Sequence, residues 1–212
     1  MANRNQGGFG LRPVNTLGNT PATSGQSKYQ IENGVAFNIY NGEPVILDRT
    51  VVAAAGGFLT NGCASAGTLF LGVFNGCFFN AVTTAKPTWS NAYLSTYNTG
   101  VVSGELVTAF VNDNPFQEYE IALTAATGAA PITQDTIQNQ FGGLADTTAS
   151  ATSTGGRSSC TLAAPTASGA GAHGWAALRS AEDPDNSDFT AAYASIIVVQ
   201  NLKYSQLVAG TA

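Results

Sequence analysis

Hydrophobic and polar residues alternate along much of this chain, and that pattern predicts β-strands rather than helices. The alternation is clear over Tyr29–Ile31 and again over Val35–Tyr40, where successive side chains would point to opposite faces of a sheet. No segment carries a sustained apolar period of about 3.6 residues, so folds built on long helices are excluded. One short helix is predicted, over Thr133–Phe141, with Thr133 as its cap.

Glycine-rich turns separate these short strands. Asn41-Gly42 is a strong hairpin signal, which would join the preceding strand to one over Pro44–Leu47. Asn75-Gly76 would in the same way turn the chain between Leu69–Phe74 and Cys77–Phe79. Many short strands with closely spaced glycine turns predict an all-β fold, a small β-barrel or a jelly-roll-like sandwich.

The second half of the chain is expected to continue this pattern. Glu105–Val111 and Phe116–Leu123 would form an antiparallel pair around the turn at Asn112–Pro115. A connecting segment would begin at Ala85 and end near Tyr97. The other expected strands are Val51–Ala55, Ser159–Leu162, Trp175–Leu178 and Ile196–Val199.

Residues 1–27 differ from the rest of the chain. They are rich in Asn, Gly, Pro and Thr, with the apolar residues Phe9, Leu11 and Val14 scattered among them. We predict an extended N-terminal arm that is ordered only when it lies on another surface; a disordered tail is the alternative. Residues 28–212 would form a β-rich body, which can be divided into subregions at about 28–85 and 86–212. Deleting the arm is then expected to leave this body folded.

The chain carries unusually little charge. Charged residues make up 10% of its 212 residues, against roughly 25% in an average soluble domain. A surface so thinly charged is poorly protected against association, so we expect partner subunits, including copies of this chain as dimers or trimers, to cover much of it. A neutral surface of Thr, Ser and Asn is the alternative. The net charge of −5 argues against a nucleic-acid partner.

The charges are also unevenly distributed. Arg4, Arg12 and Lys28 all precede the first acidic residue, Glu32, whereas the body is acidic. This polarity suits a basic arm that docks on an acidic neighbour. No stretch is apolar for long enough to cross a membrane, and the first residues lack the apolar core of a signal peptide.

We therefore expect synthesis and folding in the cytoplasm. In that reducing compartment Cys63, Cys77 and Cys160 are expected to be free, buried thiols.

Few residues suggest chemistry. Glu118 and Glu120 lie two apart on an expected strand, roughly 7 Å from each other on one face. Retaining glycosidases hold two carboxyl groups about 5–5.5 Å apart, but they take them from separate elements, and a solvated strand face is the simpler interpretation. Asp183, Asp185 and Asp188 offer oxygen ligands for Ca²⁺, although an ordinary turn explains them equally well.

Two further patterns carry less weight. Gly169–Gly174 matches the letters of a dinucleotide fingerprint, yet a loop precedes it and a strand follows, so a flexible loop is expected. His173 has no nucleophile motif beside it. We therefore expect no enzymatic activity and no cofactor.

A series of short motifs occurs along the chain in a specific order. They are Met1–Arg4, Gly8-Phe9, Arg12-Pro13, Tyr29–Ile31, Asn41–Val45, Leu71–Cys77, Lys86–Trp89, Phe110–Pro115, Gly155–Ser158, Leu178-Arg179 and Val198–Leu202. Together they resemble the capsid decoration (cement) proteins, a family of virion structural proteins of tailed phages best known in marine and T7-like podoviruses. The resemblance spans nearly the whole chain, and residues 124–170, which are richer in Ala and Thr, depart from it.

The resemblance implies a β-barrel or jelly-roll body on the outer surface of the virion capsid, bound to the expanded shell and stabilising it. It also implies an arm that lies along the major capsid protein. The arm residues that would make this contact are Arg4, Phe9, Leu11, Arg12, Pro13 and Val14.

Two other functions stay open. A head-fibre or host-attachment module would bind surface glycans, with Trp89, Tyr93 and Tyr97 as stacking residues unless these pack in the core. A cell-wall hydrolase would use Glu118 and Glu120.

Overall fold

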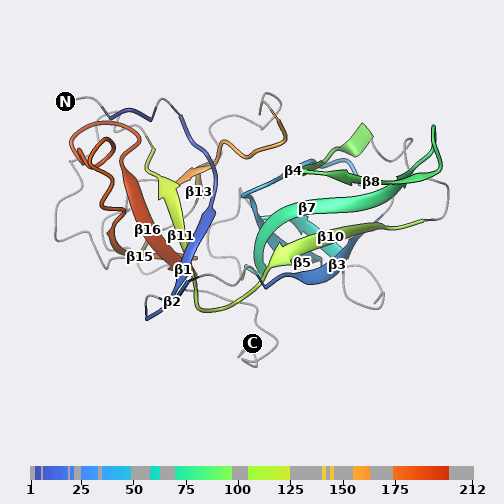
Figure 1. Cartoon of the computed structure of the whole chain (residues 1–212), viewed down its shortest axis with the longest axis horizontal. Helices are drawn as coiled ribbons and strands as arrows, with labels where there is room; N and C mark the ends of the chain where they lie inside the picture. Colours follow the sequence, from blue (N-terminus) through green and yellow to red (C-terminus); the bar gives the residue numbers. More distant parts are fainter. Residues whose placement is uncertain are drawn as a thin grey trace.

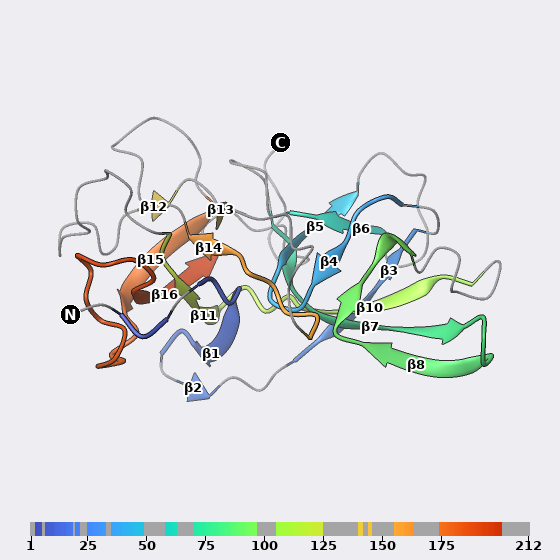
Figure 2. The same ribbon diagram turned by 90° about the horizontal axis from the view of Figure 1, so that it is seen from above.

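The structure is a computed structural model. It describes residues 3–5, 7–18, 20–21, 25–32, 35–48, 58–62, 70–96, 105–124, 140–141, 144–145, 155–162 and 174–200. This part of the chain is all-β and contains no α-helix, as the alternating sequence pattern predicts. Two β-rich lobes lie side by side along the long axis of the molecule (Figures 1 and 2).

The first lobe is a closed barrel of five strands. Its strands are β3 (Ser27–Ile31), β5 (Pro44–Asp48), β6 (Phe58–Asn61), β7 (Gly72–Ala81) and β10 (Val107–Asn112). They are hydrogen-bonded in the order β10-β3-β6-β5-β7, and pairing of β7 with β10 closes the ring. Only the contact between β3 and β6 is parallel. A sixth strand, β8 (Lys86–Ser90), forms a hairpin with β7 outside the ring.

Side chains at alternate positions of the strands fill the barrel core. Tyr29 and Ile31 on β3 and Ala109 and Val111 on β10 point inward and are buried. Gln30 and Phe110, which lie between them, are less buried, and Lys28 before Tyr29 is exposed. Over these residues β3 and β10 therefore bury one side-chain face and leave the other nearer the surface, as the sequence pattern predicts.

A β-bulge in β7 replaces the turn expected at Asn75-Gly76. Phe110 pairs with Gly76 and Val111 with Phe74, so Asn75 is an extra residue on β7. Gly76 has a φ of 141°, a conformation that a side chain at this position would disfavour. Such bulges bend a strand sharply, and here the bulge lies between the part of β7 that pairs with β5 and the part that pairs with β8.

The prediction of a hairpin at Asn41-Gly42 is wrong, although a turn forms there. Gly42 has a φ of 89°, and the amide of Glu43 donates to the Tyr40 carbonyl at 3.0 Å. The strand before the turn, β4 (Ile39–Tyr40), pairs instead with β9 (Ala92–Tyr93), whereas β5 after it enters the barrel. Local turn chemistry does not determine which strands pair.

The second lobe is built on a six-stranded antiparallel sheet. Its strands in order are β12 (Gln140–Phe141), β15 (Trp175–Ser180), β16 (Ser195–Gln200), β11 (Gln117–Ala122), β1 (Arg12–Thr16) and β2 (Thr20–Pro21). A small pair, β13 (Leu144–Ala145) and β14 (Thr161–Leu162), lies beside it. Trp175 is at the centre of the core, with its ring centroid 5.4 Å from that of Phe70 and 5.9 Å from that of Tyr119.

Three further predictions are wrong: the pairing of two strands, a segment expected to be a connection, and the end of the expected helix. β10 and β11, expected to pair, belong to different lobes, so the division falls between 112 and 117 rather than near 85. Lys86–Ser90, expected as a connection, is strand β8. Residues 133–139 of the expected helix and the expected strand at Val51–Ala55 lie outside the described residues, and Gln140–Phe141 is a strand.

The cysteine prediction is wrong for Cys160. Cys160 is disulfide-bonded, and it is fully buried in the core of the second lobe. Cys63 lies outside the described residues. Cys77 is a free, buried thiol, as predicted.

The first residues of the chain are part of the fold and not a separate arm. β1 lies between β11 and β2, and Leu11, 2% exposed, packs in the core of the second lobe. The backbone also touches the barrel, because the Leu11 amide donates to the Gly42 carbonyl at 2.9 Å. Gly10, with a φ of 73°, leaves no room for a side chain, since a Cβ would lie 2.9 Å from the Gly42 oxygen. Deleting residues 1–27 is therefore expected to disrupt folding.

Replacing Leu11 tests this structural role. Leu11→Ala should lower the free energy of unfolding by about 2–5 kcal/mol, because it removes buried methyl groups and leaves a cavity. Leu17→Ala is the matched control: Leu17 is 43% exposed, and its replacement should change stability by less than about 0.5 kcal/mol. Urea denaturation of both variants measures the difference. Equal, small effects would show that the N-terminal segment is only loosely attached.

Candidate interaction surfaces

Three aromatic side chains form a platform on the outer face of the barrel. Trp89 on β8 lies opposite Phe78 on β7. Phe110 on β10 lies opposite Gly76, two residues before Phe78 on β7. Trp89 is 47% exposed and Phe78 is 41% exposed, which is unusual for large aromatic residues. We refer to Phe78, Trp89 and Phe110 as the aromatic platform.

The indole of Trp89 is fixed by three contacts. It lies over Gly76, where any Cβ would overlap the ring. Its Nε1 donates to Asn91 Oδ1 at 3.2 Å, and its ring centroid is 5.3 Å from that of Phe110. The exposed ring is therefore held in one orientation without being buried.

Polar side chains border the platform. Strand register places Thr108 beside Phe78 and Gln30 beside Thr108. Asn80 lies two residues beyond Phe78 and donates to Glu105 at 2.7 Å. The Lys28 ammonium lies 5.9 Å from the Phe110 ring centroid.

The three stacking residues expected from the sequence differ in their exposure. Trp89 is exposed, as a stacking residue must be. Tyr93 is buried in the barrel core, where burial raises its pKa to about 12, so it cannot stack on a ligand. Tyr97 lies outside the described residues. Phe78 and Phe110 were missed, although outward alternation on β7 and β10 was the available signal.

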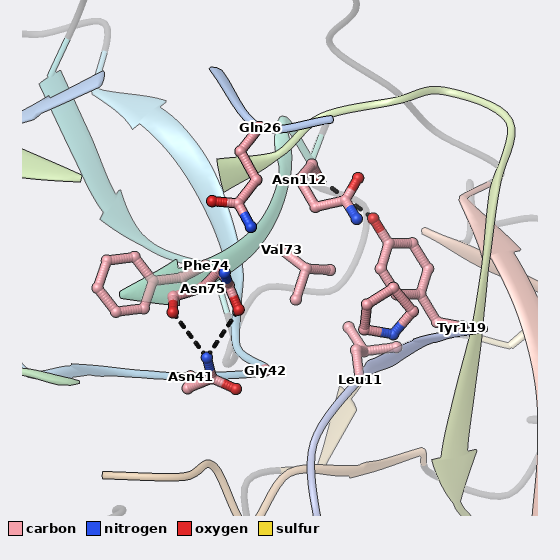
Figure 3. Close-up of a pocket in the computed structure, with 10 residues that line it drawn as sticks. Leu11, Gln26, Asn41, Gly42, Val73, Phe74, Asn75, Asn112 and Tyr119 are labelled. Atoms are coloured by element: carbon pink, nitrogen blue, oxygen red, sulfur yellow. Dashed lines mark hydrogen bonds between the residues drawn. The ribbon is translucent and has the colours of Figure 1, made fainter. Parts of the chain in front are cut away.

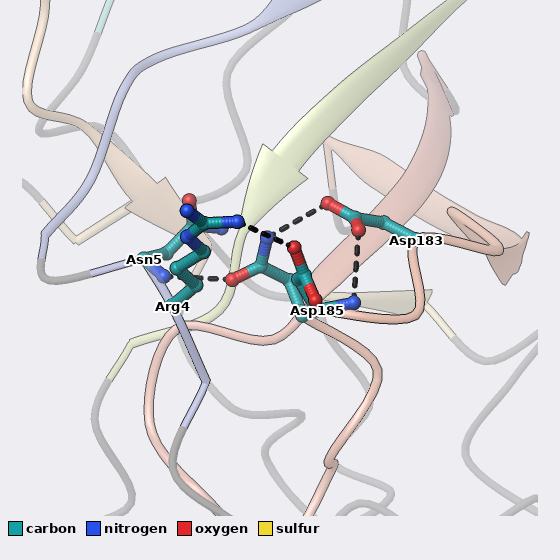
Figure 4. A network of polar contacts seen from close by, with 5 residues as sticks. Arg4, Asn5, Asp183 and Asp185 are labelled. Carbon is teal, nitrogen blue, oxygen red and sulfur yellow. Dashed lines mark hydrogen bonds and ion pairs between the residues drawn. The ribbon is translucent and has the colours of Figure 1, made fainter.

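The basic N-terminus docks on the chain's own acidic loop (Figure 4). Arg4 makes an ion pair with Asp185 at 2.8 Å, and its amide donates to the Asp185 carbonyl at 3.1 Å. The Asn5 amide donates to Asn186 Oδ1 at 2.7 Å. The ion pair is solvent-exposed and contributes little, so the hydrogen bonds of the backbone and amides hold the segment.

The other residues predicted to contact a partner have different surroundings. Leu11 is committed to the core. Phe9 is half-buried, with the Arg12 guanidinium 3.8 Å above its ring centroid. Arg12 and Pro13 are exposed, and Val14 is half-buried. Only part of the predicted contact set is therefore accessible.

A second apolar patch lies where β1 ends. Leu17 is 43% exposed and Phe116 is 56% exposed, and the Leu17 amide donates to the Phe116 carbonyl at 2.8 Å. We refer to Leu17 and Phe116 as the β1 patch. It lies on the second lobe, whereas the aromatic platform lies on the barrel.

The three aspartates proposed for calcium have separate partners. Asp183 accepts from Asn186 Nδ2 at 2.7 Å, Asp185 pairs with Arg4, and Asp188 accepts from Thr190. These hydrogen bonds lower the pKa of Asp183, and that of Asp188 to about 2. Among the residues that the structure describes, no group of three or more such side chains could hold a metal ion.

Glu118 and Glu120 do not form a matched pair of carboxylates. Glu118 is buried and accepts from Arg179 at 2.6 Å, a bond that raises the pKa of the guanidinium. A bulge at Leu178 brings Arg179 to this face, because Ala177 pairs with Val198 and Arg179 with the next residue, Ile197. Glu120 lines a neighbouring cavity of about 400 Å³.

A smaller cavity of about 100 Å³ lies between the lobes (Figure 3). Its wall includes the amides of Gln26, Asn41 and Asn75. Asn41 Nδ2 donates to the Asn75 carbonyl at 2.7 Å, and the Tyr119 hydroxyl donates to the Asn112 carbonyl at 3.1 Å. At this size the cavity fits a few water molecules.

The remaining sequence candidates fall largely outside the part of the chain that the structure describes. His173 and residues 169–173 of the glycine-rich segment lie outside the described residues. In the described ranges, no helix is long and apolar enough to span a membrane. Comparisons with protein-family models, with curated proteins and with solved structures found no match to this chain.

The buried thiol of Cys77 offers a test of packing in the barrel core. Burial raises the pKa of Cys77 from 9.0 to about 12. The Cys77 thiol therefore ionises at a lower pH in the unfolded chain than in the folded protein. The stability that comes from burying the protonated thiol is complete below about pH 9 and is lost as the pH rises toward about 12. Urea denaturation should show a steeper alkaline loss of stability for the wild type than for Cys77→Ala. Parallel curves would contradict a buried, protonated Cys77.

Proposed function

We propose that this chain is a virion structural protein that decorates the capsid of a tailed phage. It binds the outer surface of the expanded shell and stabilises it. Three features support the proposal: the ordered series of motifs that resembles the decoration proteins, the all-β fold, and a charge content of only 10%. The last of these is typical of a surface that other subunits cover.

The observation that carries the proposal is the β1 patch. Leu17 and Phe116 are two large apolar side chains, each more than 40% exposed, at the end of a strand that belongs to the structural core of its lobe. An exposed apolar pair of this kind is typical of a protein contact. The hydrogen bond from the Leu17 amide to the Phe116 carbonyl, next to the pairing of β1 with β11, holds the two residues together before binding, which lowers the entropic cost of association.

Stabilisation of the shell would follow from differential affinity. A protein that binds the expanded shell more tightly than the unexpanded one shifts the equilibrium toward the expanded state. Each bound copy adds free energy in proportion to the logarithm of its concentration over its Kd. With many copies on one shell, a few kcal/mol per copy would resist the pressure of packaged DNA. Dimers or trimers would fit the symmetry junctions of such a shell.

The hydrolase alternative has no geometric support in the described residues. A retaining mechanism needs one protonated carboxylic acid beside a free nucleophilic carboxylate. Glu118 is instead tied to Arg179 at 2.6 Å. This contact, together with the burial of Glu118, keeps its carboxylate away from a substrate.

Binding to capsids tests the proposal. Purified protein is mixed with expanded and with unexpanded shells that lack it, and bound copies are counted after sedimentation. Saturable binding to expanded shells, at hundreds of copies, is expected. Leu17→Asp with Phe116→Asp should weaken binding by about a hundredfold or more, because two charges would be buried in the contact.

The control variant is Trp89→Ala, which changes the other lobe and should bind shells normally. Circular dichroism and urea denaturation establish that both variants fold. Binding of only a few copies, or equal binding to both shell forms, would contradict decoration. Normal binding by the Leu17/Phe116 variant would show that the β1 patch is not the contact.

A further inference from the structure

We propose that the aromatic platform on the barrel is a carbohydrate-binding site, in which the exposed indole of Trp89 stacks on a neutral pyranose ring. The platform is separate from the β1 patch. The inference therefore stands or falls independently of capsid binding.

The first argument is that Trp89 is already arranged for stacking. Gly76 supports the ring from below, Phe110 packs against it at 5.3 Å between centroids, and Asn91 accepts its Nε1–H at 3.2 Å. The indole needs no rotamer change, and its one polar group already has a partner. A ligand that stacks on the free face therefore loses little side-chain entropy on binding.

The second argument excludes addition of a partner strand. β8 is at the edge of its sheet, and within the described part of the chain it pairs only with β7. Open edges can accept a further strand. β8 contains both Lys86 and Pro87, however, and these two residue types on an edge strand oppose such pairing. A ligand must therefore bind the side-chain face and not the backbone edge.

The third argument concerns size. The exposed parts of Trp89 and Phe78 together amount to on the order of 200 Å², since each ring offers 150–250 Å² and less than half is exposed. A stable protein contact covers about 800 Å² on each partner. The platform covers only a small part of such a contact, whereas its area matches one or two sugar rings.

The fourth argument is the polarity of the border. Gln30, Asn80 and Thr108 carry amide or hydroxyl groups that donate and accept hydrogen bonds, as the hydroxyls of a sugar require. Lys28 and Glu105 are one cation and one anion. A nearly neutral border with a single cation does not suit nucleic acid, which needs several cations along its backbone. It suits an uncharged sugar, whose C–H face packs on the rings.

The position of the platform fits an outward-facing role. The hairpin of β7 and β8 lies at one end of the long axis, and the lobe that contains β1 and the N-terminus lies at the other (Figures 1 and 2). A molecule attached through the β1 patch would leave the platform open to solvent. Both sites could then be occupied at once.

Tryptophan fluorescence gives a direct readout. The chain has two tryptophans, and Trp175 is fully buried, so a ligand on the surface should change the emission of Trp89 alone. The full chain is titrated with neutral oligosaccharides: maltohexaose, cellohexaose and chitohexaose. A saturable change in emission is expected with at least one of them, and calorimetry then gives the affinity.

Two substitutions at one position make the test specific. Trp89→Ala should weaken binding by about tenfold or more, because a central stacking ring is lost. Trp89→Phe keeps an aromatic ring and should retain part of the affinity. The Leu17→Asp/Phe116→Asp variant should bind sugars like the wild type. Urea denaturation shows whether each variant is folded.

Three results would overturn the proposal. The first is no saturable binding to any of the three oligosaccharides. The second is binding that Trp89→Ala leaves unchanged. The third is that single-stranded DNA or heparin binds through Trp89 while the neutral sugars do not.

Discussion

The packing of the N-terminal segment against both lobes is the contact on which the rest of the structure depends. Leu11 fills the core of the second lobe, while its amide bonds to Gly42 at the barrel. β1 then completes the sheet beside β11. Without it, β11 would expose an unpaired edge and the core would lose a buried side chain. One segment thus links the two lobes and supports the β1 patch at its end.

The two candidate surfaces follow from this arrangement. The β1 patch is held by the hydrogen bond from the Leu17 amide to the Phe116 carbonyl, next to the pairing of β1 with β11. The aromatic platform is rigid for a different reason: the bulge at Gly76 makes room for the Trp89 indole against the backbone. In both cases an exposed apolar side chain is held by a backbone feature and not by burial. Such preorganisation is typical of binding surfaces.

Sequence periodicity predicted individual strands well and their partners poorly. The alternation at Tyr29–Ile31 and the β-branched run at Ile196–Val199 both correspond to strands. The turn at Asn41-Gly42 also formed, yet its flanking strands pair elsewhere. Alternation depends on neighbouring residues, whereas pairing depends on which distant segments can bury their apolar faces together. The disulfide at Cys160 was missed for the same reason.

By itself the sequence determined the all-β class, the inward and outward faces of most strands, and the polarity between a basic start and an acidic loop. These properties arise from side-chain spacing and charge, which are local. The tertiary structure alone decided that the first residues belong to the fold, that Arg4 meets Asp185 of its own chain, and that Trp89 stands exposed while Tyr93 is buried. Each of these outcomes requires residues far apart in the chain to compete for the same space, and no local pattern records that competition.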